Sequence, residues 1–115
     1  METILIVLDS KKLENPDLDI LYALPEQLET YTDKEMYDNG YDYLNNTELG
    51  IWLATKSAKE NCSKLIEFLK QNEICGNNLS ETAKIYISEQ ENAPLDKCIL
   101  VYDGEISTDF SGNVL

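Results

Sequence analysis

A run of apolar and β-branched residues near the start of the chain, ETILIVL at residues 2–8, most constrains the fold. The run lacks the alternation of a half-exposed strand. It therefore predicts a strand buried on both faces, in the middle of a sheet. The rest of the chain must supply the neighbours of this strand.

The most secure helix is predicted at residues 57–71. Ser57 and Glu60 have the spacing of a capping box, and apolar residues recur at helical spacing from Ala58 to Leu69. Gly76 is expected to end the short segment that follows this helix. A second, shorter helix is predicted from Pro25 to Tyr31, because proline suits the first position of a helix and two acids follow it. Residues 18–24 fit either a short strand or a helical turn.

Asn39-Gly40 is the strongest local turn signal in the chain, because both central residues of a type I′ turn need positive φ. We expect residues 34–38 and 41–45 to pair around it. A second turn at Asn45-Asn46 and a strand at 49–55 complete a three-strand meander. Alternation places Tyr41 and Tyr43 on one face and Asp42 on the other. Further strands are predicted at 83–88 and 97–102, a turn at Asp103-Gly104, and an edge strand in the tail at 107–115.

The resulting order is strand, short helix, meander, long helix and two strands. This order predicts one α+β domain over residues 1–115, with a mostly antiparallel sheet and two helices on one face. A ferredoxin-like or related split β-α-β sandwich is the expected architecture.

The charge limits the class of partner. Twenty-two acidic residues face nine basic ones, giving a formal net charge of −13. Such a surface repels phosphate backbones and anionic lipid, which disfavours direct binding to nucleic acid or to a membrane. Between residues 26 and 49, seven acids face one lysine. A basic protein is therefore the expected macromolecular partner, although acidity also serves solubility.

Catalytic signatures are missing from the sequence. The chain has no histidine, and all nine basic residues are lysine. The commonest general base, the usual zinc ligands and bidentate phosphate clamps are therefore absent. We expect no enzyme, with no catalytic, cofactor-binding or metal-binding residues; an enzyme based on paired carboxylates is the remaining catalytic alternative. The first apolar run does not resemble a secretory signal, and a cytoplasmic location is expected.

Four of the seven tyrosines, at positions 31, 37, 41 and 43, lie in a segment rich in acids. Tyrosine among carboxylates is a composition typical of protein interfaces, because the ring gives contact area and the charges steer a basic partner. The alternative is that Tyr41 and Tyr43 only cover one face of a hairpin. The candidate partner-binding residues are Asp17, Asp19, Asp33, Glu35, Tyr37, Asp38, Tyr41, Asp42 and Tyr43.

Two segments in the first half of the chain carry a resemblance. Residues 15–25 match the pattern NPDxDxxYxLP, and residues 38–43 match DxGYDY. These segments resemble a family of small bacterial proteins of uncharacterised role. The motif positions Asp17, Asp19, Tyr22, Asp38, Tyr41, Asp42 and Tyr43 are the polar residues that this resemblance singles out.

In size, charge and lack of catalytic residues, the chain is also similar to the immunity proteins that neutralise polymorphic toxins. This similarity implies a non-catalytic, acidic inhibitor that covers a basic protein partner such as a toxin nuclease. An oligomerising or small-molecule-binding domain without catalysis is the alternative. The sequence leaves open whether the protein is a monomer or a homodimer.

Overall fold

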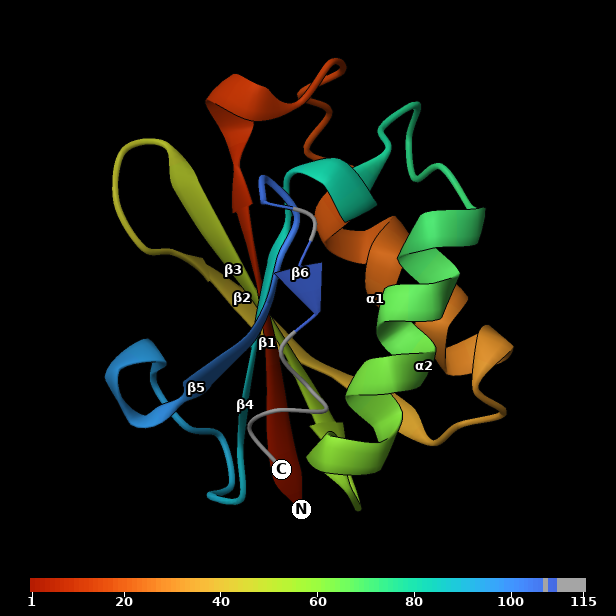
Figure 1. The fold of residues 1–115 in the computed structure, drawn as a ribbon, viewed down its shortest axis with the longest axis vertical. Coiled ribbons are helices and arrows are strands. Elements are labelled where there is room, and N and C mark those ends of the chain that lie inside the picture. The colour runs from red at the N-terminus through yellow and green to blue at the C-terminus, as the bar shows by residue number, and fades with distance from the viewer. Residues whose placement is uncertain (107, 110–115) are drawn as a thin grey trace.

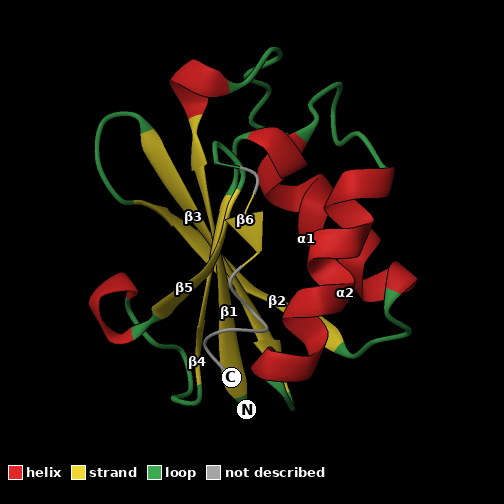
Figure 2. Ribbon diagram, in the orientation of Figure 1, coloured by secondary structure: helices red, strands yellow, loops and turns green. Residues whose placement is uncertain are grey.

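The fold is one antiparallel sheet with two helices packed on one of its faces. The computed structural model describes residues 1–106 and 108–109. In chain order its elements are β1 (Glu2–Asp9), α1 (Ile20–Tyr31), β2 (Met36–Tyr43), β3 (Glu48–Thr55), α2 (Ala58–Gln71), β4 (Lys84–Ser88), β5 (Ile99–Asp103) and β6 (Thr108–Asp109), with short 3-10 helices at Ser10–Lys12, Leu79–Glu81 and Leu95–Lys97. Figure 1 shows α1 and α2 side by side against the sheet, and Figure 2 shows the same layers coloured by secondary structure.

The strand order β2-β3-β1-β4-β5-β6 confirms the predicted fold class. β1, α1 and β2 form one split β-α-β unit, because β3 lies between the two strands. β3, α2 and β4 form a second unit, split by β1. Together they make a ferredoxin-like sandwich, which β5 and β6 extend at one edge.

β1 is the central strand, as its apolar run predicts. It pairs with β3 on one side and with β4 on the other. Its residues 3–8 are buried on both faces, with Ile4, Ile6 and Leu8 in the main core under the helices.

The second face of the sheet is covered in part by the segment between β4 and β5. The hydroxyl of Thr3 donates to the carbonyl of Gln90 at 2.8 Å, and the backbone N–H of Ala93 donates to the same hydroxyl at 3.1 Å. The indole N–H of Trp52 donates to the carbonyl of Ala93 at 2.8 Å. These bonds hold the segment against the face of β1 and β3 that lies away from the helices, so Trp52 packs there and is not part of the core under α1 and α2.

The prediction for α2 is confirmed, including its cap. The side chain of Ser57 accepts a hydrogen bond from the backbone N–H of Glu60. The predicted apolar stripe is buried, together with Asn61 and Phe68. Past the helix, Cys75 and Gly76 both have positive φ, and they form a turn bridged by Ile74 and Asn77. This is where Gly76 was expected to end the segment.

The predicted start of α1 is wrong. The helix begins at Ile20, so residues 18–24 are helical for most of their length, and Pro25 lies inside the helix. The first turn is held by burial of Ile20, Leu21 and Leu24 in the core. This packing outweighs the backbone hydrogen bond that proline removes.

The predicted hairpin around Asn39-Gly40 is also wrong. Residues 36–43 form the single strand β2, which pairs with β3 in one ladder, and Asn39-Gly40 is a bulge within it. The second predicted turn, at Asn45-Asn46, is confirmed, because β2 ends at Tyr43 and β3 begins at Glu48. The expected three-strand meander is therefore a two-strand hairpin.

The remaining strand predictions hold to within two residues. β3, β4 and β5 correspond to the runs at 49–55, 83–88 and 97–102. β6 adds the expected edge strand at 108–109. Residues 107 and 110–115 of the predicted tail lie outside the described residues.

Candidate protein-binding surface

β2 is an edge strand, and its position gives the tyrosines their exposure. It pairs with β3 on one side, and from Tyr37 to Tyr43 every residue is exposed. Gly40 supports the bulge with a φ of +96°, in the left-handed region that glycine adopts at least cost. The bulge shifts the register between Asp38 and Tyr41, and so it decides which face each later side chain takes.

Tyr41 and Tyr43 lie on the helical face of the sheet. They pair with Ile51 and Leu49, which belong to the core under the helices. Asp42 pairs with Gly50 and therefore lies on the opposite face, as predicted. Tyr37 pairs with Ala54, which places it on the opposite face from Tyr41.

α1 brings a further tyrosine to the same place. The ring of Tyr22 meets the ring of Tyr41 edge to face, with centroids 5.7 Å apart and planes at 84°. Their hydroxyl groups share a hydrogen bond of 3.0 Å. The hydrogen bond with Tyr22 raises the pKa of Tyr41, because it favours the protonated phenol. The charge interaction with Tyr22 and partial burial raise it further. The NPDxDxxYxLP motif at 15–25 and the DxGYDY motif at 38–43 are therefore in contact through these two rings.

The segment before α1 is fastened to the turn after α2. The side-chain oxygen of Asn77 accepts from the backbone N–H of Asn15 at 2.8 Å, and its amide donates to the carbonyl of Asn15 at 2.8 Å. The Asn15 side chain in turn donates to the carbonyl of Cys75 at 2.9 Å. Asn15 is therefore a structural residue of its motif, and it fixes the approach to α1.

Asp17 and Asp19 lie near this turn. The carboxylate of Asp17 accepts from the backbone N–H of Asp19 at 2.9 Å and so shapes the turn into the helix. The pKa of the Cys75 thiol is raised by its partial burial and then by the negative charges of Asp17 and Asp19. Negative potential thus extends from the start of α1 to Cys75.

The exposed rings and acids of α1 and β2 form one surface. Tyr22, Tyr41 and Tyr43 are 58%, 43% and 57% exposed. On α1, Asp19 and Glu26 lie one turn before and one turn after Tyr22, at the spacings that share a helix face. We define the α1–β2 surface as Asp19, Tyr22, Glu26, Asp38, Tyr41 and Tyr43.

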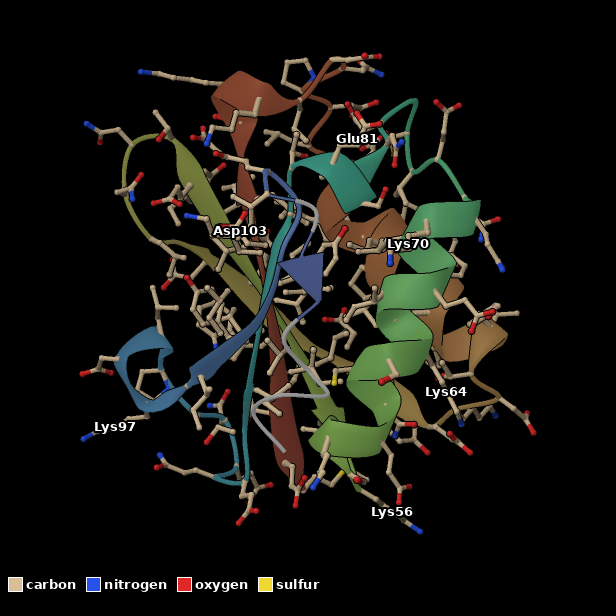
Figure 3. All side chains as sticks on the ribbon, viewed as in Figure 1. Lys56, Lys64, Lys70, Glu81, Lys97 and Asp103 are labelled. Carbon is tan, nitrogen blue, oxygen red and sulfur yellow. The ribbon has the colours of Figure 1, made fainter. Side chains whose placement is uncertain are left out.

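Two of the predicted residues belong to a different environment. Glu35 and Tyr37 line a hollow of about 360 Å³ at the start of α2, together with Lys34, Lys56 and Lys64. Glu35 forms a salt bridge with Lys64. Figure 3 labels Lys56 and Lys64 beside α2, on the other side of the sheet from Lys97. The local lysines make this hollow a poor site for a basic partner.

Several of the predicted acids also have local structural roles. The carboxylate of Asp38 accepts from the N–H of Gly40 at 3.0 Å, and that of Asp42 accepts from the N–H of Tyr43 at 2.8 Å. Asp33 lies in the turn after α1 with a φ of +52°. Charge reversal at Asp38 or Asp42 would therefore disturb β2 as well as remove charge.

Sequence reasoning left Tyr22 and Glu26 out of the candidate partner-binding residues. Tyr22 is exposed and bonded to Tyr41, although it is distant from the tyrosine-rich segment. The motif at 15–25 contains Tyr22, and that was the signal available. Tyr31 is separate from the surface, because its ring packs against Phe68 of α2 with centroids 4.8 Å apart.

Three further properties concern residues 1–106 and 108–109. No group of three or more carboxylate or cysteine side chains among them could hold a metal ion. Neither helix has both the length and the apolar character that a membrane span requires. The three cysteines are thiols, and Cys62 is buried in the core.

Comparison of the chain with protein-family models, with curated proteins and with solved structures finds no match.

Proposed function

We propose that the protein is a non-catalytic binding protein of the immunity or inhibitor type. It acts in the bacterial cytoplasm and captures a basic protein, such as a toxin nuclease, through the α1–β2 surface. The observation that carries this proposal is the group of exposed tyrosines, Tyr22, Tyr41 and Tyr43, among acids of α1 and β2.

The physical basis is complementarity. A nuclease groove presents positive charge to bind phosphate, and a chain with a net charge of −13 is drawn to it over a distance of about 10 Å at moderate salt. Tyrosine rings then supply contact area with little loss of side-chain entropy, and their hydroxyl groups supply hydrogen bonds. Such a complex blocks the groove without any reaction.

The alternative function, a small-molecule or oligomerisation domain, predicts buried Tyr41 and Tyr43 rings and a large apolar pocket elsewhere. Both rings are substantially exposed. This exposure favours the binding proposal.

The test compares two charge-reversed variants of equal net charge. Asp19→Lys with Glu26→Lys alters the α1–β2 surface at two exposed residues, and it leaves in place Asp38 and Asp42, whose carboxylates bond backbone N–H groups of β2. Glu89→Lys with Asp96→Lys makes the same change in charge in the segment between β4 and β5. Each variant is used to capture proteins from the bacterial host at about 50 mM salt, and the captured protein is purified and its Kd measured against salt.

We expect a basic protein whose association weakens about tenfold or more between 50 and 300 mM salt. The α1–β2 variant should bind it at least about tenfold more weakly than the control variant. Capture of a neutral partner with affinity independent of salt, or equal loss in both variants, would refute the proposal.

A further inference from the structure

The ring pair of Tyr22 and Tyr41 has a shape that a planar cation fits. With the planes at 84° and the centroids 5.7 Å apart, the two rings form a right-angled corner. One wall of the corner is a ring from α1 and the other is a ring from the edge strand β2. The hydroxyl hydrogen bond fixes the angle between them, so the corner exists before any partner arrives.

The corner is open to solvent and bordered by negative charge. Tyr22 is 58% exposed and Tyr41 is 43% exposed. Asp19 and Glu26 lie on either side of Tyr22 along α1. On β2, Asp38 shares the helical face with Tyr41, because it pairs with Leu53 of the core. Aromatic faces next to carboxylates are complementary to a cation that is flat and apolar on its surfaces and charged at its edge.

We propose that the Tyr22–Tyr41 corner is the anchor site for an arginine side chain of the basic partner. This inference rests on the function proposed above and names the group that the partner supplies. The guanidinium stacks on the exposed ring faces, and its N–H groups reach the phenol oxygens and the neighbouring carboxylates.

Arginine fits this corner better than lysine. A guanidinium is planar and weakly hydrated, so it stacks on a ring while its edge still donates hydrogen bonds. A lysine ammonium is compact and strongly hydrated, and it would leave the second wall of the corner without a contact. If the corner is the binding site, the protein should bind an arginine side chain more tightly than a lysine side chain of the same charge. General attraction to the acidic surface would not distinguish arginine from lysine.

The test uses two small probes of equal charge, acetylated and amidated Gly-Gly-Arg-Gly-Gly and its lysine counterpart. Each is titrated into the full chain at low salt while the tyrosine ring signals are followed by NMR. The variants are Tyr22→Ala, Tyr41→Ala and the double replacement by phenylalanine. Tyr37→Ala is the matched control, because Tyr37 lies on the same strand with 38% exposure but on the opposite face.

The arginine peptide should shift the ring signals of Tyr22 and Tyr41 and bind several-fold more tightly than the lysine peptide. Either alanine variant should weaken its binding about tenfold. The double phenylalanine variant should bind with intermediate affinity, because the ring faces remain but the hydroxyl bond that sets their angle is lost. Tyr37→Ala should bind as the unaltered chain does. Backbone spectra of each variant establish that it is folded.

Equal binding of the two peptides, or unchanged binding of the arginine peptide to the alanine variants, would overturn the anchor site. Either result leaves the proposed function standing if a basic partner is still captured in a manner that depends on salt and on Asp19 and Glu26. If no basic protein is captured at low salt, the proposed function itself fails. The two failures are therefore distinguishable.

Discussion

Tyr41 lies at the boundary between an edge strand and a helix, and one hydrogen bond joins it across that boundary to Tyr22. We expect Tyr22→Phe to lower the pKa of Tyr41 toward the ordinary phenol value of 10.0, because the hydroxyl that favours its protonated form is removed. Titration of the tyrosine ring signals by NMR measures this change. A Tyr41 pKa that does not move would contradict the contact.

The same contact makes one contribution to stability that depends on pH. The pKa of Tyr41 is raised in the folded chain, so the unfolded chain loses its proton first as the pH increases. The contribution of the hydrogen bond is thus complete below pH 10.0 and is lost as the pH rises through the folded-state pKa.

Gly50 is required by the position of Trp52. A Cβ atom at residue 50 would lie 2.7 and 2.9 Å from two atoms of the Trp52 ring and 3.2 Å from Leu5. The indole is held by its bond to Ala93 and cannot swing away without losing it. We expect Gly50→Ala to destabilise the fold by about 1–3 kcal/mol, measured by denaturant unfolding.

A Trp52→Phe background is the control for this prediction. The smaller ring relieves the clash, so Gly50→Ala should cost less there than in the unaltered chain. If Gly50→Ala destabilised the fold equally in both backgrounds, the clash with Trp52 would not be the cause of the destabilisation.

Individual roles of the polar residues were only partly predictable. The sequence shows that Asp38, Asp42 and Tyr41 are polar positions on strands, and the faces of Tyr41 and Asp42 followed from alternation. The face of Asp38 did not, because the bulge shifts the register between Asp38 and Tyr41. It does not show that Asp38 and Asp42 bind backbone N–H groups of their own strand, since this depends on the bulge at Asn39-Gly40. The partnership of Tyr22 with Tyr41 depends on how far α1 extends and where it packs.

At the scale of elements, β1 and α2 were predictable because each carries a pattern that needs no distant information. The apolar run of β1 and the capped, periodic stripe of α2 favour one structure each. The hairpin was mispredicted because a local turn signal competed with pairing along a whole strand. Leu49, Ile51 and Leu53 face the core, and this fixes a register in which residues 36–43 form one strand.

The turn that does form, between β2 and β3, is stabilised by the side chain of Asn45. The side-chain oxygen of Asn45 accepts from the N–H groups of Thr47 and Glu48, both at 2.9 Å. Asparagine at this position is a turn signal in itself. Two asparagine turn signals thus lay close together, and the packing of β3 against the core selected the second.

Asn77 joins two elements that are far apart in sequence. Its side chain is almost fully buried and bonds Asn15 in both directions. We expect Asn77→Ala to destabilise the fold by about 1–3 kcal/mol, because buried backbone groups lose their partner. Denaturant unfolding measures this, and the exposed neighbour Asn78 provides the control as Asn78→Ala. Equal effects of the two changes would contradict the assigned role.

For the whole molecule, the net charge of −13 means that the folded chain repels itself. We expect the melting temperature to rise by several degrees between about 10 and 200 mM NaCl, because salt screens this repulsion. Calorimetry on the unaltered chain measures the change. The charge-reversed variants with Lys at two acidic positions should respond less, and a melting temperature that falls with salt would contradict the expectation.

The position of β1 has a consequence for how the protein is made. This strand leaves the ribosome before both of its neighbours, and the second of these, β4, ends at Ser88. Until β4 has been synthesised and pairs with β1, the apolar side chains of β1 stay partly exposed to solvent. A nascent chain halted before β4 should therefore be bound by chaperones and degraded by proteases. Folding of this domain is thus expected to await the synthesis of β4, in contrast to a helical bundle, which can form its contacts as it emerges.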